Sequence, residues 1–282
     1  MRKSIAIIIT SILVLSGCNK QQSVSDRLLN EVEKAIAINP DSASNLLKSI
    51  SSPEKLDDKA FARWCMLSGK ITDEIFNSIL PTYQLERAYD WYSSHGSPDE
   101  QVQILIYLGR SYFADGDYDK AMSIYTNALD IAGKNKLNNL IGYTYDYIGD
   151  LYREKFMRTE AIKRYEIAAE YFKKEKNTDS YACALRDIGR EYAQMDSLSH
   201  ALNILIIADS VAANTSNINV TASINNALGN IYSMQNKYDK AEEYLLKALL
   251  TGREKMPDYV ALIDLYTASN SINKAKELLS KI

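Results

Sequence analysis

The chain has 282 residues, of which 46% are apolar and 24% are charged. This composition is ordinary for a globular protein and excludes a disordered, collagen-like or disulfide-stapled chain. The formal net charge is −3, and the sequence has no run of Lys and Arg of the kind that binds phosphate groups, so we expect no nucleic-acid partner. With only 11 Gly and 5 Pro, the sequence favours many helices joined by short turns.

Residues 1–17 have the features of a bacterial signal peptide. Arg2 and Lys3 give a positive start, and the apolar segment 5–14 is too short to cross about 30 Å of hydrocarbon as a helix. The sequence Leu-Ser-Gly-Cys follows at 15–18 and resembles the bacterial lipobox. The resemblance implies cleavage before Cys18 and lipidation of that cysteine, with palmitate as one acyl chain, because two or three chains anchor a protein stably. The alternative is an ordinary signal peptide with a chance cysteine.

The residues after the predicted cleavage site bear on location. Residues 18–25 are polar and predict a short lipidated tether, so that the membrane is contacted through the lipid alone. Asn19 is not the Asp that retains enterobacterial lipoproteins in the inner membrane. No acidic run follows Cys18, whereas such a run is associated with surface export in the Bacteroidota. By resemblance we expect a Gram-negative lipoprotein, of the Bacteroidota, that is attached to the outer membrane and faces the periplasm rather than the cell surface.

Four segments repeat with a spacing of 40 residues. Each has a Gly, a Tyr three residues later, and Ala residues twelve and nineteen residues after the Gly; the four glycines are Gly109, Gly149, Gly189 and Gly229. These columns resemble the tetratricopeptide repeat, a pair of antiparallel helices. The resemblance implies an all-α, right-handed superhelical solenoid. We expect each Gly to face an Ala of the second helix, which would let the two helices approach closely.

The period continues with weaker matches on both sides of the four clear repeats. We expect about seven helix pairs in one solenoid over residues 26–282, since a single pair leaves an apolar face that only stacking can bury. The predicted pairs are 26–52, 57–96, 98–135, 137–175, 177–214, 217–252 and 256–282. The last pair ends in apolar residues, which indicates either fraying or a contact with a partner or a second copy of the chain.

A groove on the concave surface is the predicted binding site. In tetratricopeptide repeat proteins this surface is lined by the first helix of each pair, at positions three before and one after the Gly column. By resemblance, the polar candidates are Lys70, Arg110, Asp146, Asp150, Arg186, Arg190, Asn226 and Asn230. Asparagine can hydrogen-bond the backbone of an extended peptide, and arginine can bind carboxylates with two parallel bonds. The alternative is a structural ladder in which the acids of one helix pair with the arginines of the next.

The other chemical motifs are weak. The segment 115–119 alternates acids like a calcium loop, but Lys120 and Thr126 replace the required Gly and Glu. The two histidines have no companions that would form a metal site. Asp146 and Asp150 are expected to be exposed on one helix, where nothing would raise either pKa for acid catalysis. We therefore expect no enzymatic activity, no metal and no cofactor other than the covalent lipid on Cys18.

These features together predict a lipid-anchored scaffold or adaptor that binds a protein or peptide segment in its groove. A second interpretation is a peptide-sensing receptor, or a regulatory sensor of the same repeat type, that passes a change in shape to a partner.

Overall fold

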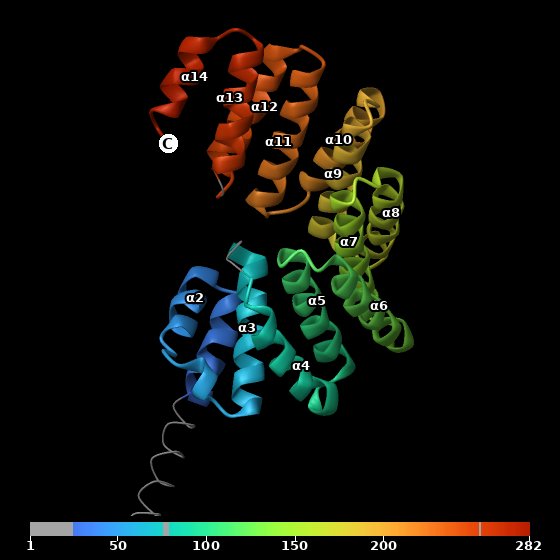
Figure 1. Ribbon diagram of the computed structural model, residues 1–282. Helices are drawn as coiled ribbons and strands as arrows, with labels where there is room; N and C mark the ends of the chain where they lie inside the picture. The colour runs from blue at the N-terminus through green and yellow to red at the C-terminus, as the bar shows by residue number, and fades with distance from the viewer. Residues whose placement is uncertain (1–24, 76–78, 254) are drawn as a thin grey trace, which may run out of the picture. The chain divides into compact units, whose positions relative to one another are not determined.

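The computed structural model describes residues 25–75, 79–253 and 255–282, and every regular element in these ranges is a helix (Figure 1). The prediction of an all-α fold is confirmed. The predicted signal peptide and Cys18 lie outside the described residues. Within the described residues no helix is both long enough and apolar enough to cross a membrane.

The chain divides into two compact units, residues 1–135 and 136–282. The described part of the first unit contains a helix over residues 25–36 and the elements α2 (Pro40–Lys48), η1 (Pro53–Lys55), α3 (Asp58–Ile75), α4 (Thr82–His95), α5 (Pro98–Ala114) and α6 (Tyr118–Asn135). The second unit contains α7 (Asn138–Glu154), α8 (Arg158–Lys174), α9 (Thr178–Gln194), α10 (Leu198–Ala212), α11 (Ile218–Met234), α12 (Tyr238–Thr251), α13 (Met256–Ala268) and α14 (Ile272–Leu279).

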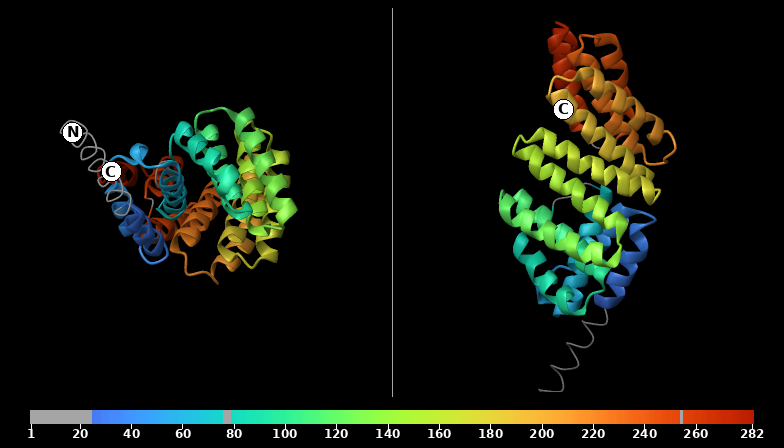
Figure 2. Two further views of the ribbon diagram at one scale, coloured as in Figure 1. Left: turned by 90° about the horizontal axis from the view of Figure 1, so that it is seen from below. Right: turned by 90° about the vertical axis from the view of Figure 1, so that its right-hand side faces the viewer.

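Within each unit the helices form antiparallel pairs, and each pair packs on the next (Figure 2). The first helices of consecutive pairs also touch, α3 with α5, α9 with α11 and α11 with α13. The described helices therefore make seven pairs, as the repeat predicts. Stacking covers the apolar face that each pair would otherwise expose to water.

Repeated turns join the two helices of a pair. In four pairs the backbone N–H of the third residue past the first helix donates to the carbonyl oxygen of the repeat tyrosine at 2.9 Å, as Met157 does to Tyr152. The residue before that donor has a left-handed backbone, and it is Gly116 in one pair but Phe156, Asp196 and Asn236 in the others. This is the Schellman arrangement, which satisfies carbonyl groups at a helix end.

The glycine column has a different neighbour from the expected one. A Cβ atom on Gly109 would lie 2.2 Å from the ring of Tyr125, and one on Gly149 would lie 2.4 Å from the ring of Tyr165. The large side chain sixteen residues later, a Tyr in these two pairs and a Leu at Gly189 and Gly229, therefore fills most of the space that each Gly leaves. The expected contact between Gly and Ala is therefore present only in part: the carbonyl oxygens of Ala201 and Ala241 lie 3.4 and 3.2 Å from the Cβ positions at Gly189 and Gly229, but the larger side chain is the nearer neighbour in each of these four pairs.

Candidate functional site

The second unit contains a pocket of about 740 Å³, within the range of typical ligand sites. Side chains of the first helices α7, α9, α11 and α13 line it, together with the start of α8. The lining residues are Arg153, Arg158, Asp187, Arg190, Glu191, Ala193, Gln194, Ala227, Asn230, Ile231, Ser233, Met234, Ala261 and Asp264. The pocket thus combines an apolar wall with three arginines and three acids.

Asp187 lies at the centre of the charged groups. Its two carboxylate oxygens accept hydrogen bonds from Nε and Nη2 of Arg186, at 3.0 and 2.6 Å. Burial by itself raises the pKa of Asp187, but the adjacent Arg186 and its hydrogen bonds outweigh burial and hold the pKa below its ordinary value. Arg186 also donates to the hydroxyl of Ser223 on α11 at 2.9 Å, so it ties α9 to the next pair.

Arg190 is held much less firmly than Arg186. Its Nη1 lies 3.4 Å from one oxygen of Asp187, and 43% of its side chain is exposed. Burial of the guanidinium, followed by the positive charge of Arg186, lowers the pKa of Arg190 below its ordinary value. Arg190 lines the pocket, whereas Arg186 does not.

Asp146 and Asp150 are not the exposed pair that the sequence predicts. Both side chains are partly buried on α7, and Oδ1 of Asp146 is enclosed without a hydrogen-bond partner among the described residues. Burial, followed by the charge of Asp150, raises the pKa of Asp146 well above its ordinary value. Burial likewise raises the pKa of Asp150, against the opposing effect of Arg153. The expectation of carboxyl groups with unraised pKa values was therefore wrong, because it ignored the helices that cover them.

Among the described residues, no ion pair joins Asp146 or Asp150 of α7 to Arg186 or Arg190 of α9, as the alternative of a ladder between these helices would require. Asp150 pairs with Arg153 on its own helix at 2.8 Å and accepts a hydrogen bond from Tyr165 on α8, also at 2.8 Å. Arg186 and Arg190 both form ion pairs with Asp187, which lies on the same helix. Asp150, Arg186 and Arg190 thus each have an ion-pair partner one or three positions away on the same helix, whereas Asp146 has none within 4 Å in the described part of the chain.

The two predicted groove asparagines of α11 are linked to each other and to α13. Nδ2 of Asn226 donates to Asp258 at 2.7 Å, and Nδ2 of Asn230 donates to Oδ1 of Asn226 at 3.0 Å. Asn226 is only 7% exposed, so its amide is committed to the contact between consecutive pairs. Asn230 lines the pocket, and of the two asparagines it is the one placed to meet a ligand.

Sequence reasoning missed several charged residues of this site. Arg158 at the start of α8 pairs at 2.9 Å with Glu191, whose side chain is 2% exposed. Arg153, Asp187 and Asp264 were missed as well. The spacing of Asp150 and Arg153, three residues apart on one helix, was a usable signal. The pairing of Arg158 with Glu191 joins positions 33 residues apart, which no local pattern predicts.

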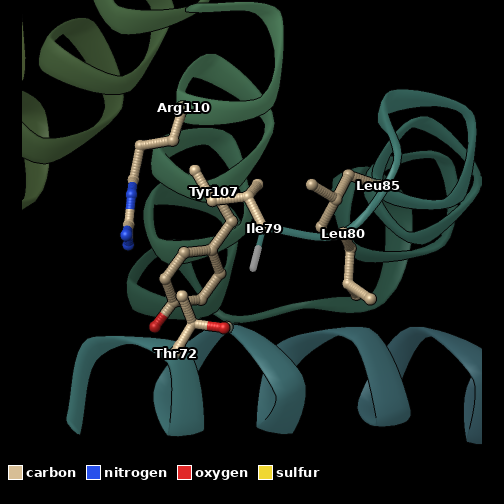
Figure 3. Close-up of a pocket in the computed structure, with 7 residues that line it drawn as sticks. Thr72, Ile79, Leu80, Leu85, Tyr107 and Arg110 are labelled. Carbon is tan, nitrogen blue, oxygen red and sulfur yellow. The ribbon is translucent and has the colours of Figure 1, made fainter. Parts of the chain in front are cut away.

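Two predicted groove residues, Lys70 and Arg110, belong to the first unit. Lys70 is partly exposed on α3. Arg110 pairs with Asp73, which also accepts a hydrogen bond from the hydroxyl of Tyr107 at 2.9 Å. Arg110, Tyr107 and Thr72 surround a cavity of about 10 Å³ (Figure 3), which holds about one water molecule and no larger ligand.

The described residues provide little for other chemistry. They contain no cluster of three or more His, Cys, Asp or Glu side chains arranged to hold a metal ion. Cys65 and Cys183 are both free thiols. Burial raises the pKa of Cys65 to about 12 and also raises that of Cys183, so neither favours the reactive thiolate.

Comparison with known families agrees with the helix pairs. Models of the tetratricopeptide repeat match residues 105–138 and 221–256, which cover most of α5 with α6 and of α11 with α12. The chain contains tetratricopeptide repeats. The match at 221–256 lies in the second unit, and the match at 105–138 lies in the first unit except for its last three residues.

Similar proteins have varied roles. The chain is 32% identical over 91 residues to photosystem I assembly protein Ycf3 of Rippkaea orientalis, and the match covers 32% of this chain and about half, 52%, of that protein. Among solved structures, a Rap protein in complex with competence and sporulation factor superposes with a TM-score of 0.75 at 19% identity. The superposition covers 92% of this chain and 75% of the Rap chain. The apo form of the quorum sensor NprR of B. thuringiensis superposes with a TM-score of 0.58 at 15% identity, again over 92% of this chain and 75% of the other. These structures share the fold.

Proposed function

We propose that the protein is a binding scaffold and that the pocket of the second unit holds a segment of a protein partner. The observation that carries this proposal is the pocket of about 740 Å³, which combines polar and apolar side chains from four consecutive first helices. An extended peptide presents alternating backbone amides and side chains. Asn230, Gln194 and Ser233 offer partners for the amides, while the apolar wall accepts side chains.

Site-specific photo-crosslinking tests this proposal. Gln194 is exposed and lines the pocket, and Glu170 is also exposed on α8 but does not line it. A photoreactive amino acid at Gln194 in the full-length protein, activated in intact cells, is expected to give a discrete protein adduct that Glu170 does not give. Identical adducts at both positions, or none at Gln194, would contradict the proposal. Circular dichroism of both variants confirms that each remains folded.

We further propose that the scaffold is lipidated on Cys18 and attached to the outer membrane, facing the periplasm. The support is the sequence of residues 1–19, with its positive start, its short apolar segment and the lipobox-like end. Metabolic labelling with palmitate, compared between the native protein and Cys18→Ala, tests lipidation. Separation of inner and outer membranes, with protease treatment of intact cells, tests location. Absence of label in the native protein would overturn the anchor.

A regulatory sensor is the second candidate function. The fold similarity to a Rap protein and to the quorum sensor NprR over 92% of the chain favours it. A sensor must change shape when its ligand binds, whereas a scaffold need not. Once a ligand is found by crosslinking, small-angle X-ray scattering with and without it separates the two. A ligand-dependent change in the radius of gyration favours the sensor, and an unchanged value favours the scaffold.

A homodimer formed through the last helix pair is a further proposal about partners. Ile272 and Leu279 on α14 are 42% and 56% exposed. Sedimentation velocity of the native protein and of a variant carrying both Ile272→Ser and Leu279→Ser tests it. A dimer that the two substitutions dissociate is expected, and a native monomer would contradict the proposal.

A further inference from the structure

We propose that Arg190 binds a single carboxylate on the segment held in the pocket, and that Arg186 keeps Arg190 available by occupying Asp187. This inference rests on the proposed function, since it names the chemistry of the ligand that the pocket takes. It also divides two arginines four residues apart into a ligand-binding residue and a positioning residue.

The charges of the pocket are unevenly matched. Arg158 pairs with Glu191 at 2.9 Å, and Arg153 pairs with Asp150 at 2.8 Å. Both distances are those of strong, charge-assisted hydrogen bonds. Two of the three arginines that line the pocket are therefore already occupied by carboxylates.

Arg190 is the third arginine, and its contact with Asp187 is longer, at 3.4 Å. Asp187 offers Arg190 a poor partner because both of its oxygens already accept from Arg186, at 3.0 and 2.6 Å. A guanidinium has five N–H donors in a planar fork that matches a carboxylate. With 43% of its side chain exposed, Arg190 can present this fork to a ligand in the pocket.

The surroundings of Arg190 favour one negative charge on the ligand and oppose two. Burial and the positive charge of Arg186 lower the pKa of Arg190, because both disfavour its charged guanidinium. A nearby anion would stabilise the charged guanidinium. However, the carboxylates of Asp187, Glu191 and Asp264 line the same pocket and repel a doubly charged group. A carboxylate therefore fits better than a phosphate monoester.

The apolar wall limits what accompanies the carboxylate. Ala227, Ile231 and Ala261 come from α11 and α13 and face the same pocket as Arg190. An acidic group beside an apolar side chain would satisfy both parts. The carboxylate has two possible sources, an Asp or Glu side chain within the segment or the carboxyl terminus of the bound chain.

Peptide selection on the full-length protein tests the inference, with two libraries that separate the sources. In one, random octapeptides are followed by a fixed linker, so that only side chains supply carboxylates; in the other, they end in a free carboxyl group. The strongest binder is then synthesised with its carboxylate and with the matching amide. The expected result is that the amide form binds the native protein about tenfold or more weakly than the acid form, as loss of a charged hydrogen bond predicts.

Three variants assign this preference to residues. Arg190→Gln is expected to bind the acid and amide forms equally. Arg186→Lys is expected to reduce the preference, because a lysine cannot hold both oxygens of Asp187 and leaves one to Arg190. A purely structural effect would weaken both forms alike and leave their ratio unchanged. Lys240→Gln removes one charge from the exposed surface of α12 and is expected to keep the full preference.

The possible failures are distinguishable. If peptides bind in the pocket, but acid and amide forms bind the native protein equally or Arg190→Gln keeps the preference, the inference is wrong and the proposed function stands. Ser233→Trp adds bulk to a partly exposed pocket position and is expected to block binding. If no peptide is selected, or if binding survives Ser233→Trp in a variant that melts like the native protein, the proposed function and this inference both fail.

Discussion

Arg186 donates to both carboxylate oxygens of Asp187, the next residue on α9, while Arg190 reaches one of them at 3.4 Å. The buried Asp187 thus pairs closely with Arg186 and more loosely with Arg190. Removing its charge would leave Arg186, itself largely buried, without a counter-ion. We therefore expect the stability of the second unit to depend on this carboxylate.

Asp187→Asn is expected to lower the free energy of unfolding by about 3 kcal/mol, because breaking a buried ion pair from one side leaves an uncompensated charge. Urea denaturation followed by circular dichroism measures the change. Glu243→Gln is a matched control, since Glu243 pairs with Lys247 on the exposed side of α12, and no measurable change is expected there. A loss of less than about 1 kcal/mol for Asp187→Asn would show that the pair stabilises little.

Stability should also depend on pH through Asp146. Its pKa in the folded chain is raised above the ordinary 3.8 by burial and by the charge of Asp150. A carboxyl group of this kind stabilises the fold below its unfolded pKa, and that contribution is lost as the pH rises through its folded pKa. Asp146→Asn cannot ionise. Its free energy of unfolding, relative to that of the native protein, is therefore expected to increase between pH 4 and pH 8.

Urea denaturation at several pH values in this range measures the effect. Glu170→Gln, on the exposed surface of α8, serves as the control and should show a constant difference from the native protein. A constant difference for Asp146→Asn as well would mean that the pKa of Asp146 is not raised by folding.

The glycine column predicts a steric effect. The Cβ atom of Gly149→Ala would overlap the ring of Tyr165, which is fully buried. A loss of about 1–3 kcal/mol in the free energy of unfolding is expected from overpacking. Gly133→Ala on α6 meets nothing within 4 Å and should instead stabilise the helix by about 0.5–1 kcal/mol. Thermal melting of both variants checks the opposite signs.

The turn after α7 offers a stabilising substitution. Phe156 has a φ of 57° and is 79% exposed, so its side chain gains little from burial while its backbone is strained. Phe156→Gly is expected to raise the free energy of unfolding by about 1 kcal/mol. Gly116 occupies the equivalent turn with a φ of 79°, and Gly116→Ala should cost a similar amount. A destabilised Phe156→Gly would show that contact of the ring with Arg158 matters more than the strain.

Much of the fold could be predicted from the sequence because it depends on short-range periodicity. The glycine at position 149 and the tyrosine at position 152 recur 40 residues later as Gly189 and Tyr192, and such columns identify helix pairs without knowledge of side-chain contacts. Neighbouring repeats then stack because their apolar faces must be covered. The side chain beside each Gly, Tyr125, Tyr165, Leu205 or Leu245, was not identified, since several buried positions fit the same periodicity.

The site was harder to predict because partner choice depends on side-chain geometry. Position 226 was correctly placed on a first helix, but the acid that its amide meets, Asp258, is 32 residues away on α13. Arg186 and Arg190 lie four residues apart on α9. Arg186 contacts both oxygens of Asp187, whereas Arg190 contacts one oxygen at 3.4 Å and has a side chain that is 43% exposed. Which one takes the central acid is decided by distances of a few tenths of an ångström, which a sequence pattern does not contain.

Every residue that lines the pocket falls between Arg153 and Asp264, a continuous stretch of the second unit. The proposed binding pocket is therefore encoded as one uninterrupted cassette. Insertions in the first unit would leave its register intact, and the cassette could be transplanted onto another carrier protein without splicing distant segments together.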